Sequence, residues 1–424
     1  MDRQADWQRR LSHIVETLRE MSMQTDPQQM VSAYAKRMRQ ILPIDRTIAV
    51  SRRNLQQPWY RITRSSLWKE EINPWKQQDR LPVFNRGILG ELLYADEPQL
   101  IDDLRLSADD PAHEFLADMR SLVSLPMYDG GVALNTVIFA RATPNAFSRD
   151  QLADLVWVTG LFGRATYNLV LKQQVQEAFD AVDFELKMVE RIQKSLLPRE
   201  LPKIEHLDLA AYYQTSHRAG GDYYDFFPLQ DGSWGILIAD VSGHGTPAAV
   251  MMAITHSIAH TAPGPPTPPS RMLHYLNQQL SVRYTNDSPS FVTAFYGIFN
   301  PKTRELTYAS AGHNPPRLKR CDDGTMAALD RVGGLPLGVL PDQTYEEAVL
   351  ALRPGDQLIF YTDGITEAHN PQREMFGVER LDQALELCTF AAEPLIEAVL
   401  SALADFTQGQ PADDDRTLLV AKVN

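Results

Sequence analysis

The sequence lacks the features that mark membrane, secreted and cysteine-stabilised proteins. No run of about 18 apolar residues occurs, which argues against a membrane-spanning helix. The first residues, Met1–Asp6, lack the apolar core of a signal peptide. Cysteine occurs only as Cys321 and Cys388, too few for a disulfide framework or a cysteine-rich zinc site. These absences predict a cytoplasmic protein that has no membrane partner.

Positive charge is also in deficit. The chain has 41 Lys and Arg against 54 Asp and Glu, a formal net charge of −13. This charge repels polyphosphate at long range, so we expect no nucleic-acid partner. Hydrophobic residues make up 44% and charged residues 22%, an ordinary globular mixture. The 424 residues are enough for two or three domains, each with its own core.

The N-terminal part, residues 1–167, mixes helix and strand patterns. Asp26 followed by Pro27 is typical of an N-cap and a first-turn proline, here between two helical stretches. Ser121–Tyr128 and Val132–Ala140, separated by a glycine turn, predict a β-hairpin. With the Phe147-Ser148 entry to a long helix, this part resembles GAF domains, which implies an α/β sensor module. Its ligand stays open: a small molecule, a partner protein or none.

Residues 168–198 show a different pattern. Apolar residues alternate at intervals of three and four, no proline or glycine interrupts them, and only Glu185 breaks the stripe. This pattern predicts a helical linker that forms a parallel coiled coil, and hence a homodimer. The alternative is one amphipathic helix packed on its own domain. The stripe consists of Leu171, Val175, Ala178, Val182, Val189, Ile192 and Leu196.

Beyond Pro202, short strand-like runs alternate with two or three helices. Helices fit Pro247–Ala262, Ser270–Tyr284 and Pro394–Phe406. The expected strands are His206–Tyr213, Gly235–Asp240, Thr293–Asn300, Glu305–Ala311, Glu347–Leu352, Gln357–Thr362 and Thr417–Val423.

Four short acidic motifs are the most informative feature of this region. They are Gly220–Asp225, Asp240–Gly245, Tyr361–Gly364 and Asp413–Thr417. Each puts aspartate at the end of a strand-like run or beside a turn. Carboxylates gathered from distant segments repel one another unless a cation lies among them, and oxygen-only ligand sets favour magnesium, manganese or calcium over zinc. The motifs therefore predict a site for hard metal ions.

In order and spacing, these motifs resemble the metal-dependent protein phosphatases (PPM type), in the bacterial branch named after stage II sporulation protein E. The resemblance covers about residues 185–424 and includes Ile192–Pro198 and Ala309–Pro316. It implies a serine/threonine phosphatase domain at 199–424, folded as an α–β–β–α sandwich. The whole chain would then be an α+β protein: a GAF-like sensor, a coiled-coil linker and a phosphatase.

The resemblance also implies a site for two Mn²⁺ or Mg²⁺ ions. Asp240 would bridge them, and Asp222, Asp363 and Asp414 would hold them with help from the Val241 carbonyl. Asp240 and Asp363 are the residues that we expect to matter most for catalysis. The ligand within the triple aspartate run stays open, although the family pattern favours Asp414. Asp225 would contribute to metal binding through a water molecule or would stabilise its own turn.

General chemistry then suggests the reaction. Water between two cations becomes hydroxide near neutral pH and would attack phosphorus in line, releasing a Ser or Thr hydroxyl. Both cysteines lie outside the motifs, which disfavours a thiolate mechanism. His244 is a candidate acid for the leaving oxygen, or a histidine that caps the next helix. Arg218 is a candidate phosphate contact, or a surface arginine.

The branch typically pairs a sensor with a phosphatase that acts on a phosphorylated anti-sigma-factor antagonist, a STAS-domain protein. The resemblance implies that this chain dephosphorylates such a partner, with the helical linker transmitting the state of the sensor. The alternative is a scaffold that keeps the phosphatase fold and signals by binding. Aspartate at all four metal positions weighs against that alternative.

Overall fold

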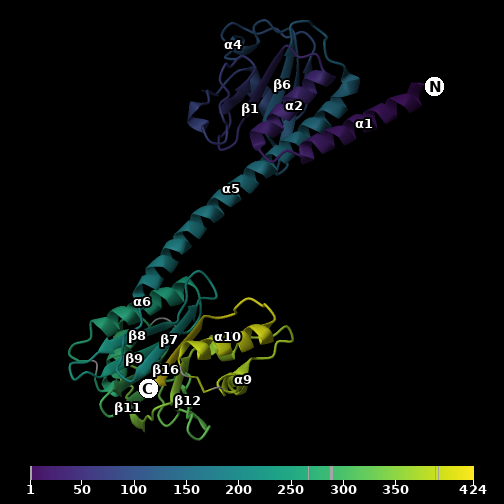
Figure 1. Ribbon diagram of the computed structural model, residues 1–424. Coiled ribbons are helices and arrows are strands. Elements are labelled where there is room, and N and C mark those ends of the chain that lie inside the picture. Colours follow the sequence, from purple (N-terminus) through teal and green to yellow (C-terminus); the bar gives the residue numbers. More distant parts are fainter. Residues whose placement is uncertain (1, 266, 287–289, 387, 390) are drawn as a thin grey trace. The chain divides into compact units, whose positions relative to one another are not determined.

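The computed structural model describes residues 2–265, 267–286, 290–386, 388–389 and 391–424. The chain divides into two compact units, Met1–Asp180 and Ala181–Asn424. One helix, α5 (Leu152–Leu196), begins in the first unit and ends in the second (Figure 1). Over the described residues, none of the helices has the length and apolar character needed to cross a membrane.

The first unit is built on a six-stranded antiparallel sheet in the order β3-β2-β1-β6-β5-β4. The predicted hairpin is confirmed as β5 (Ser121–Asp129) and β6 (Val132–Arg141). The other strands are β1 (Arg46–Ser51), β2 (Tyr60–Ser65), β3 (Val83–Phe84) and β4 (Gln99–Ile101). The helices are α1 (Asp2–Ser22), α2 (Pro27–Ile41), α3 (Ile88–Tyr94), α4 (His113–Leu116) and the start of α5.

Both faces of this sheet are covered, because successive side chains of a strand point to opposite sides. Leu122 and Ile138 pack in a core with residues of α3 and α4. Val123 and Phe139 pack in a second core with residues of α2 and α5. The predicted cap of α2 is confirmed, since the Asp26 carboxylate accepts hydrogen bonds from the backbone amides of the first helical turn at 2.9 and 3.0 Å.

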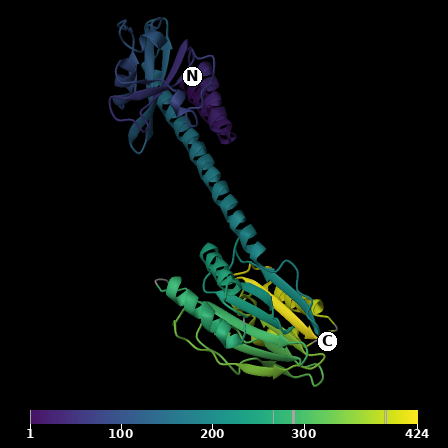
Figure 2. The same cartoon turned by 90° about the vertical axis from the view of Figure 1, so that its left-hand side faces the viewer.

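The second unit contains two five-stranded antiparallel sheets, in the orders β14-β11-β10-β9-β8 and β13-β12-β15-β16-β7 (Figure 2). The first sheet consists of β8 (Tyr223–Pro228), β9 (Trp234–Val241), β10 (Val292–Asn300), β11 (Glu305–Ala311) and β14 (Ala348–Ala351). The second consists of β7 (Leu207–Gln214), β12 (Arg317–Lys319), β13 (Met326–Ala328), β15 (Gln357–Tyr361) and β16 (Arg416–Val423).

Helices cover the outer face of each sheet. On the first sheet lie α6 (Thr246–His260) and α7 (Pro269–Arg283), and on the second lie α9 (Gly377–Ala384) and α10 (Glu393–Thr407). Between the sheets, Phe295 of β10 and Phe360 of β15 meet edge to face, 5.7 Å between ring centroids. Their neighbour Ile359 instead packs toward the second helical layer. The predicted α–β–β–α sandwich is therefore confirmed.

Several elements were not expected from the sequence. One is β8, which contains the aromatic residues that follow Asp222. The others are β12, β13 and the short α8 (Asp363–Thr366), which are too brief to show a periodic pattern. The two cysteines form a disulfide, Cys321 to Cys388, across 67 residues. Sequence spacing cannot show such a pair, because it depends on how the loop after β12 folds against the segment after α9.

Candidate active site

The four aspartates predicted as metal ligands come from the ends of strands in both sheets. Asp222 immediately precedes β8, and Asp240 lies near the end of β9; the register pairs Tyr223 with Ala239, so these aspartates are cross-strand neighbours. Asp363 follows β15 and Asp414 precedes β16, two strands that also run antiparallel. Each sheet thus brings two of the four motifs to one of its ends.

Hydrogen bonds to the Asp222 carboxylate connect the end of the first sheet with the end of the second. It is buried, and its Oδ2 accepts hydrogen bonds from the Thr362 hydroxyl at 2.8 Å and from the Thr417 hydroxyl at 2.6 Å. Its Oδ1 is buried with no hydrogen-bond partner among the described residues. An unpaired buried carboxylate oxygen is costly, so this atom fits a cation ligand.

The carboxyl groups also act on one another electrostatically. Burial raises the pKa of Asp240 to about 10, and the charges of Asp222, Asp363 and Asp414 add to that effect. Burial likewise raises the pKa of Asp222 to about 8 and that of Asp363 to about 6. Clustered, buried carboxylates resist ionisation, and a divalent cation would offset both causes. The donor set therefore fits hard metal ions.

Close backbone packing surrounds the cluster. A Cβ atom on Gly221 would lie 2.8 Å from the Val241 carbonyl oxygen, so glycine is required where these two segments meet. Gly243 and Gly245 have φ values of 88° and 76°, which let the chain turn sharply between β9 and α6. These glycines place the Val241 carbonyl and the Asp222 segment side by side.

The three aspartates of the run 413–415 have different environments. Asp415 is buried, and its two carboxylate oxygens accept hydrogen bonds from the backbone amides of Ser216 (2.8 Å) and Gly221 (2.6 Å). Asp413 is exposed, 3.3 Å from the His369 ring. Asp414 is the member whose charge raises the pKa of both Asp240 and Asp363.

The two further candidates make contacts of their own. His244 stacks on His217 with ring centroids 4.7 Å apart, and it does not cap α6, whose N-cap is Gly245 with no side-chain bond. Arg218 pairs with Asp183 of α5 at 2.8 Å. The Asp225 carboxylate has other partners, since its Oδ2 lies 2.7 Å from Nε2 of His260 on α6.

Sequence reasoning missed the residues that hold this site in place. Thr362 and Thr417 lie within two of the acidic motifs, Tyr361–Gly364 and Asp413–Thr417, which was the available signal. Gln193 of α5 is buried; its Oε1 accepts from the Gly220 amide at 3.0 Å and its Nε2 donates to the Gly220 carbonyl. Gln193 lies in the Ile192–Pro198 segment of the family pattern, and nothing in the sequence of that segment indicates its contact with Gly220.

Comparison with known proteins agrees with the resemblance to SpoIIE-type phosphatases. The family model for stage II sporulation protein E (SpoIIE) matches residues 230–424. Protein IcfG of Synechocystis sp. is 29% identical over 275 residues, which cover 59% of this chain and 43% of IcfG. Phosphoserine phosphatase RsbU of Bacillus subtilis is 32% identical over 240 residues, which cover 56% of this chain and 70% of RsbU.

A solved structure matches the fold. The SiaA-PP2C domain of Pseudomonas aeruginosa superposes with a TM-score of 0.51 at 23% identity, covering 58% of this chain and 99% of that domain. The similarity to RsbU, a phosphoserine phosphatase by name, agrees with the enzyme class predicted from the acidic motifs. The chain belongs to the SpoIIE-type family of PP2C protein phosphatases.

Proposed function

We propose that this chain is a metal-dependent phosphatase of phosphoserine or phosphothreonine proteins. The observation that carries the proposal is the cluster of four aspartates from two sheets, in which the pKa values of Asp222, Asp240 and Asp363 are raised and Oδ1 of Asp222 is buried without a partner among the described residues. Such a cluster destabilises a metal-free protein, since like charges are held together away from water. It becomes favourable when cations share the site.

In this proposal, Asp222, Asp240, Asp363 and Asp414 hold two Mn²⁺ or Mg²⁺ ions, with the Val241 carbonyl as a further ligand. When bound, the ions would lower the pKa of water and neutralise the phosphoryl oxygens. The chain's own contribution is to fix these ligands. Thr362 and Thr417 orient the Asp222 carboxylate, and the short turn after β9 presents the Val241 carbonyl.

The N-terminal unit would act as the sensor, GAF-like as its sequence suggests. It contains a cavity of about 150 Å³ between the sheet, α2 and α5. Its lining includes aromatic side chains, among them Tyr34 and Trp75, and three arginines, Arg53, Arg61 and Arg64. We propose a small molecule with an acidic group as the ligand, because guanidinium groups bind carboxylate and phosphate well.

The linker helix would carry the signal and make the dimer. Four large residues of its apolar stripe are exposed to solvent in the single chain: Leu171 (40%), Val175 (67%), Val182 (55%) and Ile192 (59%). Burying that stripe against a second copy is the expected use of a heptad pattern. At its end, Gln193 bonds to both backbone groups of Gly220, two residues before Asp222. A shift of the helix would therefore reach the Asp222 loop directly.

The substrate that we propose is a phosphorylated STAS-domain antagonist of an anti-sigma factor. Support comes from the resemblance to the SpoIIE-type branch and from the similarity to RsbU. Incubating the chain with a phosphorylated STAS protein encoded near its gene tests this point. We expect that protein to lose its phosphate. If it keeps its phosphate while a small substrate is hydrolysed, the proposed partner is wrong but the proposed phosphatase activity stands.

The decisive test of the activity is Mn²⁺-dependent hydrolysis of p-nitrophenyl phosphate. We expect turnover by the wild type and a loss of about 100-fold or more in Asp240→Asn, because a metal site contributes several kcal/mol to such a reaction. Asp342→Asn, in an exposed loop of the same unit, is the matched control and should keep wild-type turnover. Equal turnover in wild type and Asp240→Asn would leave the scaffold alternative standing.

A further inference from the structure

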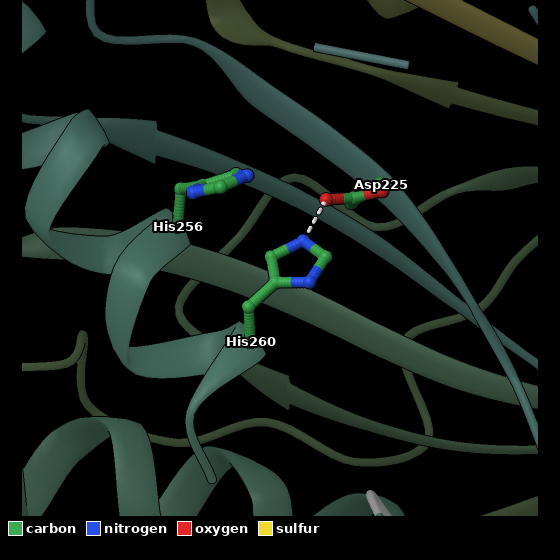
Figure 3. Close-up of side chains that lie close together, drawn as sticks. All are labelled: Asp225, His256 and His260. Atoms are coloured by element: carbon green, nitrogen blue, oxygen red, sulfur yellow. Dashed lines mark hydrogen bonds and ion pairs between the residues drawn. The ribbon is translucent and has the colours of Figure 1, made fainter. Parts of the chain in front are cut away.

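We propose that Asp225, His256 and His260 form a separate binding site for a transition-metal ion such as Zn²⁺, between β8 and α6 (Figure 3). The site uses none of the four aspartates proposed for phosphatase activity. It is therefore independent of that activity, and each can fail without the other.

The three side chains converge because of their positions on two elements. His256 and His260 stand one helical turn apart on α6, so both rings lie on one face, with centroids 4.4 Å apart. Asp225 points toward them from β8, on the same face as Tyr223, which meets the His256 ring edge to face. One ligand atom from each residue lies within 4.8 Å of the other two. Over the described residues, no other trio of potential ligands is as tight.

The chemistry of the three groups favours a borderline metal. Two imidazole nitrogens and one carboxylate oxygen suit Zn²⁺, Ni²⁺ or Co²⁺, whereas the all-oxygen aspartate cluster suits Mn²⁺ or Mg²⁺. Neither ring nitrogen of His256 has a hydrogen-bond partner in the described part of the chain. Burial lowers the pKa of His256, which keeps its ring in the neutral form that binds metals. Three protein ligands would leave a fourth position for water.

The carboxylate is already oriented by its neighbours. The Tyr223 hydroxyl donates to Asp225 Oδ2 at 2.6 Å, and the Phe226 amide donates to Oδ1 at 2.7 Å. Such outer contacts fix a metal ligand before the ion arrives. Without an ion, His260 Nε2 lies 2.7 Å from Asp225 Oδ2, within hydrogen-bond distance, and a metal ion would take the place of that hydrogen bond. The His260 side chain is 43% exposed, so its ring can shift by the small distance required and the ion can enter from solvent.

An ion at this site would join α6 to β8 and stabilise the folded protein, since it binds the native state alone. The experiment uses the full chain, stripped of metal and carrying Asp240→Asn so that the aspartate cluster is impaired. Zn²⁺ is titrated by calorimetry, and Co²⁺ is followed by the visible absorption of the four-coordinate ion. We expect a site that binds both ions and a rise in melting temperature with Zn²⁺.

The variants His256→Gln and His260→Gln, each in the Asp240→Asn chain, test the assignment. Each should weaken Zn²⁺ binding at least about 10-fold and abolish the Co²⁺ absorption. His206→Asn removes an imidazole elsewhere in the unit, at a residue with φ of 65° that asparagine tolerates, and should leave binding unchanged. His256→Gln breaks no hydrogen bond among the described residues, so it remains informative if His260→Gln fails to fold. Undiminished Zn²⁺ binding in His256→Gln would overturn the proposal.

Discussion

The carboxylate of Asp415 accepts a 2.6 Å hydrogen bond from the backbone amide of Gly221, 194 residues earlier in the chain. A Cβ atom on the neighbouring Gly220 would lie 2.1 Å from the same carboxylate, so the two segments are packed as closely as glycine allows. Asp415 is thus engaged in holding the loop that leads to Asp222. Its neighbour Asp414, whose charge raises the pKa of Asp240 and of Asp363, is the member of the run that we propose as a metal ligand.

The run 413–415 therefore predicts three different outcomes from the same substitution. Asp415→Asn should lower the free energy of unfolding by about 1–3 kcal/mol, because an amide cannot accept from both backbone groups without turning a donor toward one of them. Asp414→Asn should leave stability nearly unchanged but weaken activation by Mn²⁺. Urea denaturation and Mn²⁺ titration of phosphatase activity measure the two effects.

Asp413→Asn is the control, since the Asp413 carboxylate is exposed. This substitution should change neither the stability nor the activation by Mn²⁺ to a notable extent. A variant Asp414→Asn with normal Mn²⁺ activation would contradict the assignment of the metal ligand. Equal stability of all three variants would contradict the structural role given to Asp415.

Thr417→Val should move metal activation to higher pH. The Thr417 hydroxyl donates to the ionised Asp222 carboxylate and so lowers its pKa, against the larger effect of burial. Removing that donor raises the pKa of Asp222 further, so protons compete with Mn²⁺ up to a higher pH. Half-activating Mn²⁺ concentrations measured between about pH 6.5 and 8.5 should rise most at the acid end.

Thr307→Val, on β11 and outside the site, makes the same chemical change as a control. Parallel pH profiles for wild type and Thr417→Val would show that the hydroxyl does not tune Asp222. A uniform loss of activity at every pH, with normal Mn²⁺ affinity, would point to a purely structural role.

Gln193→Leu should uncouple the end of α5 from the loop that carries Asp222. The substitution keeps the side chain's size but removes its bonds to both backbone groups of Gly220. Leaving buried polar groups unpaired costs about 1–3 kcal/mol, and we expect weaker Mn²⁺ activation as the loop loosens. Lys194→Gln removes only an exposed pair with Glu190 and should change neither property. Wild-type activation in Gln193→Leu would argue against a coupling route through this residue.

The double variant Val182→Ser with Val189→Ser should make the protein monomeric. Both positions belong to the apolar stripe of α5, and serine removes the surface that a second helix would bury. Sedimentation analysis gives the oligomeric state, and the phosphatase assay shows whether activity depends on it. Asp180→Asn with Arg191→Gln changes two exposed residues off the stripe as a control. If oligomeric state and activity both stay the same in the serine variant, the coiled-coil proposal is wrong.

The sequence by itself determined the parts of this protein that depend on neighbouring residues. Alternating patterns predicted β10, β11, β15 and β16 to within a residue or two at each end, and the cap of α2 followed from Asp26-Pro27. The acidic motifs predicted the family and placed the four aspartates at strand ends, because strand ends and glycine turns are local features. The short strands β12 and β13 were not predicted, since three residues are too few to show a periodic pattern.

Only the tertiary structure decided which side chains support the site. The bonds from Thr362 and Thr417 to Asp222 span 140 and 195 residues, and no periodicity records contacts at such separations. The bonds that Asp415 accepts from the amides of Ser216 and Gly221 were likewise invisible in a run of identical residues. The approach of Asp225 to His256 and His260 depends on how α6 packs on β8. Sequence patterns place a residue on an element, whereas its partners are set by the packing of one element on another.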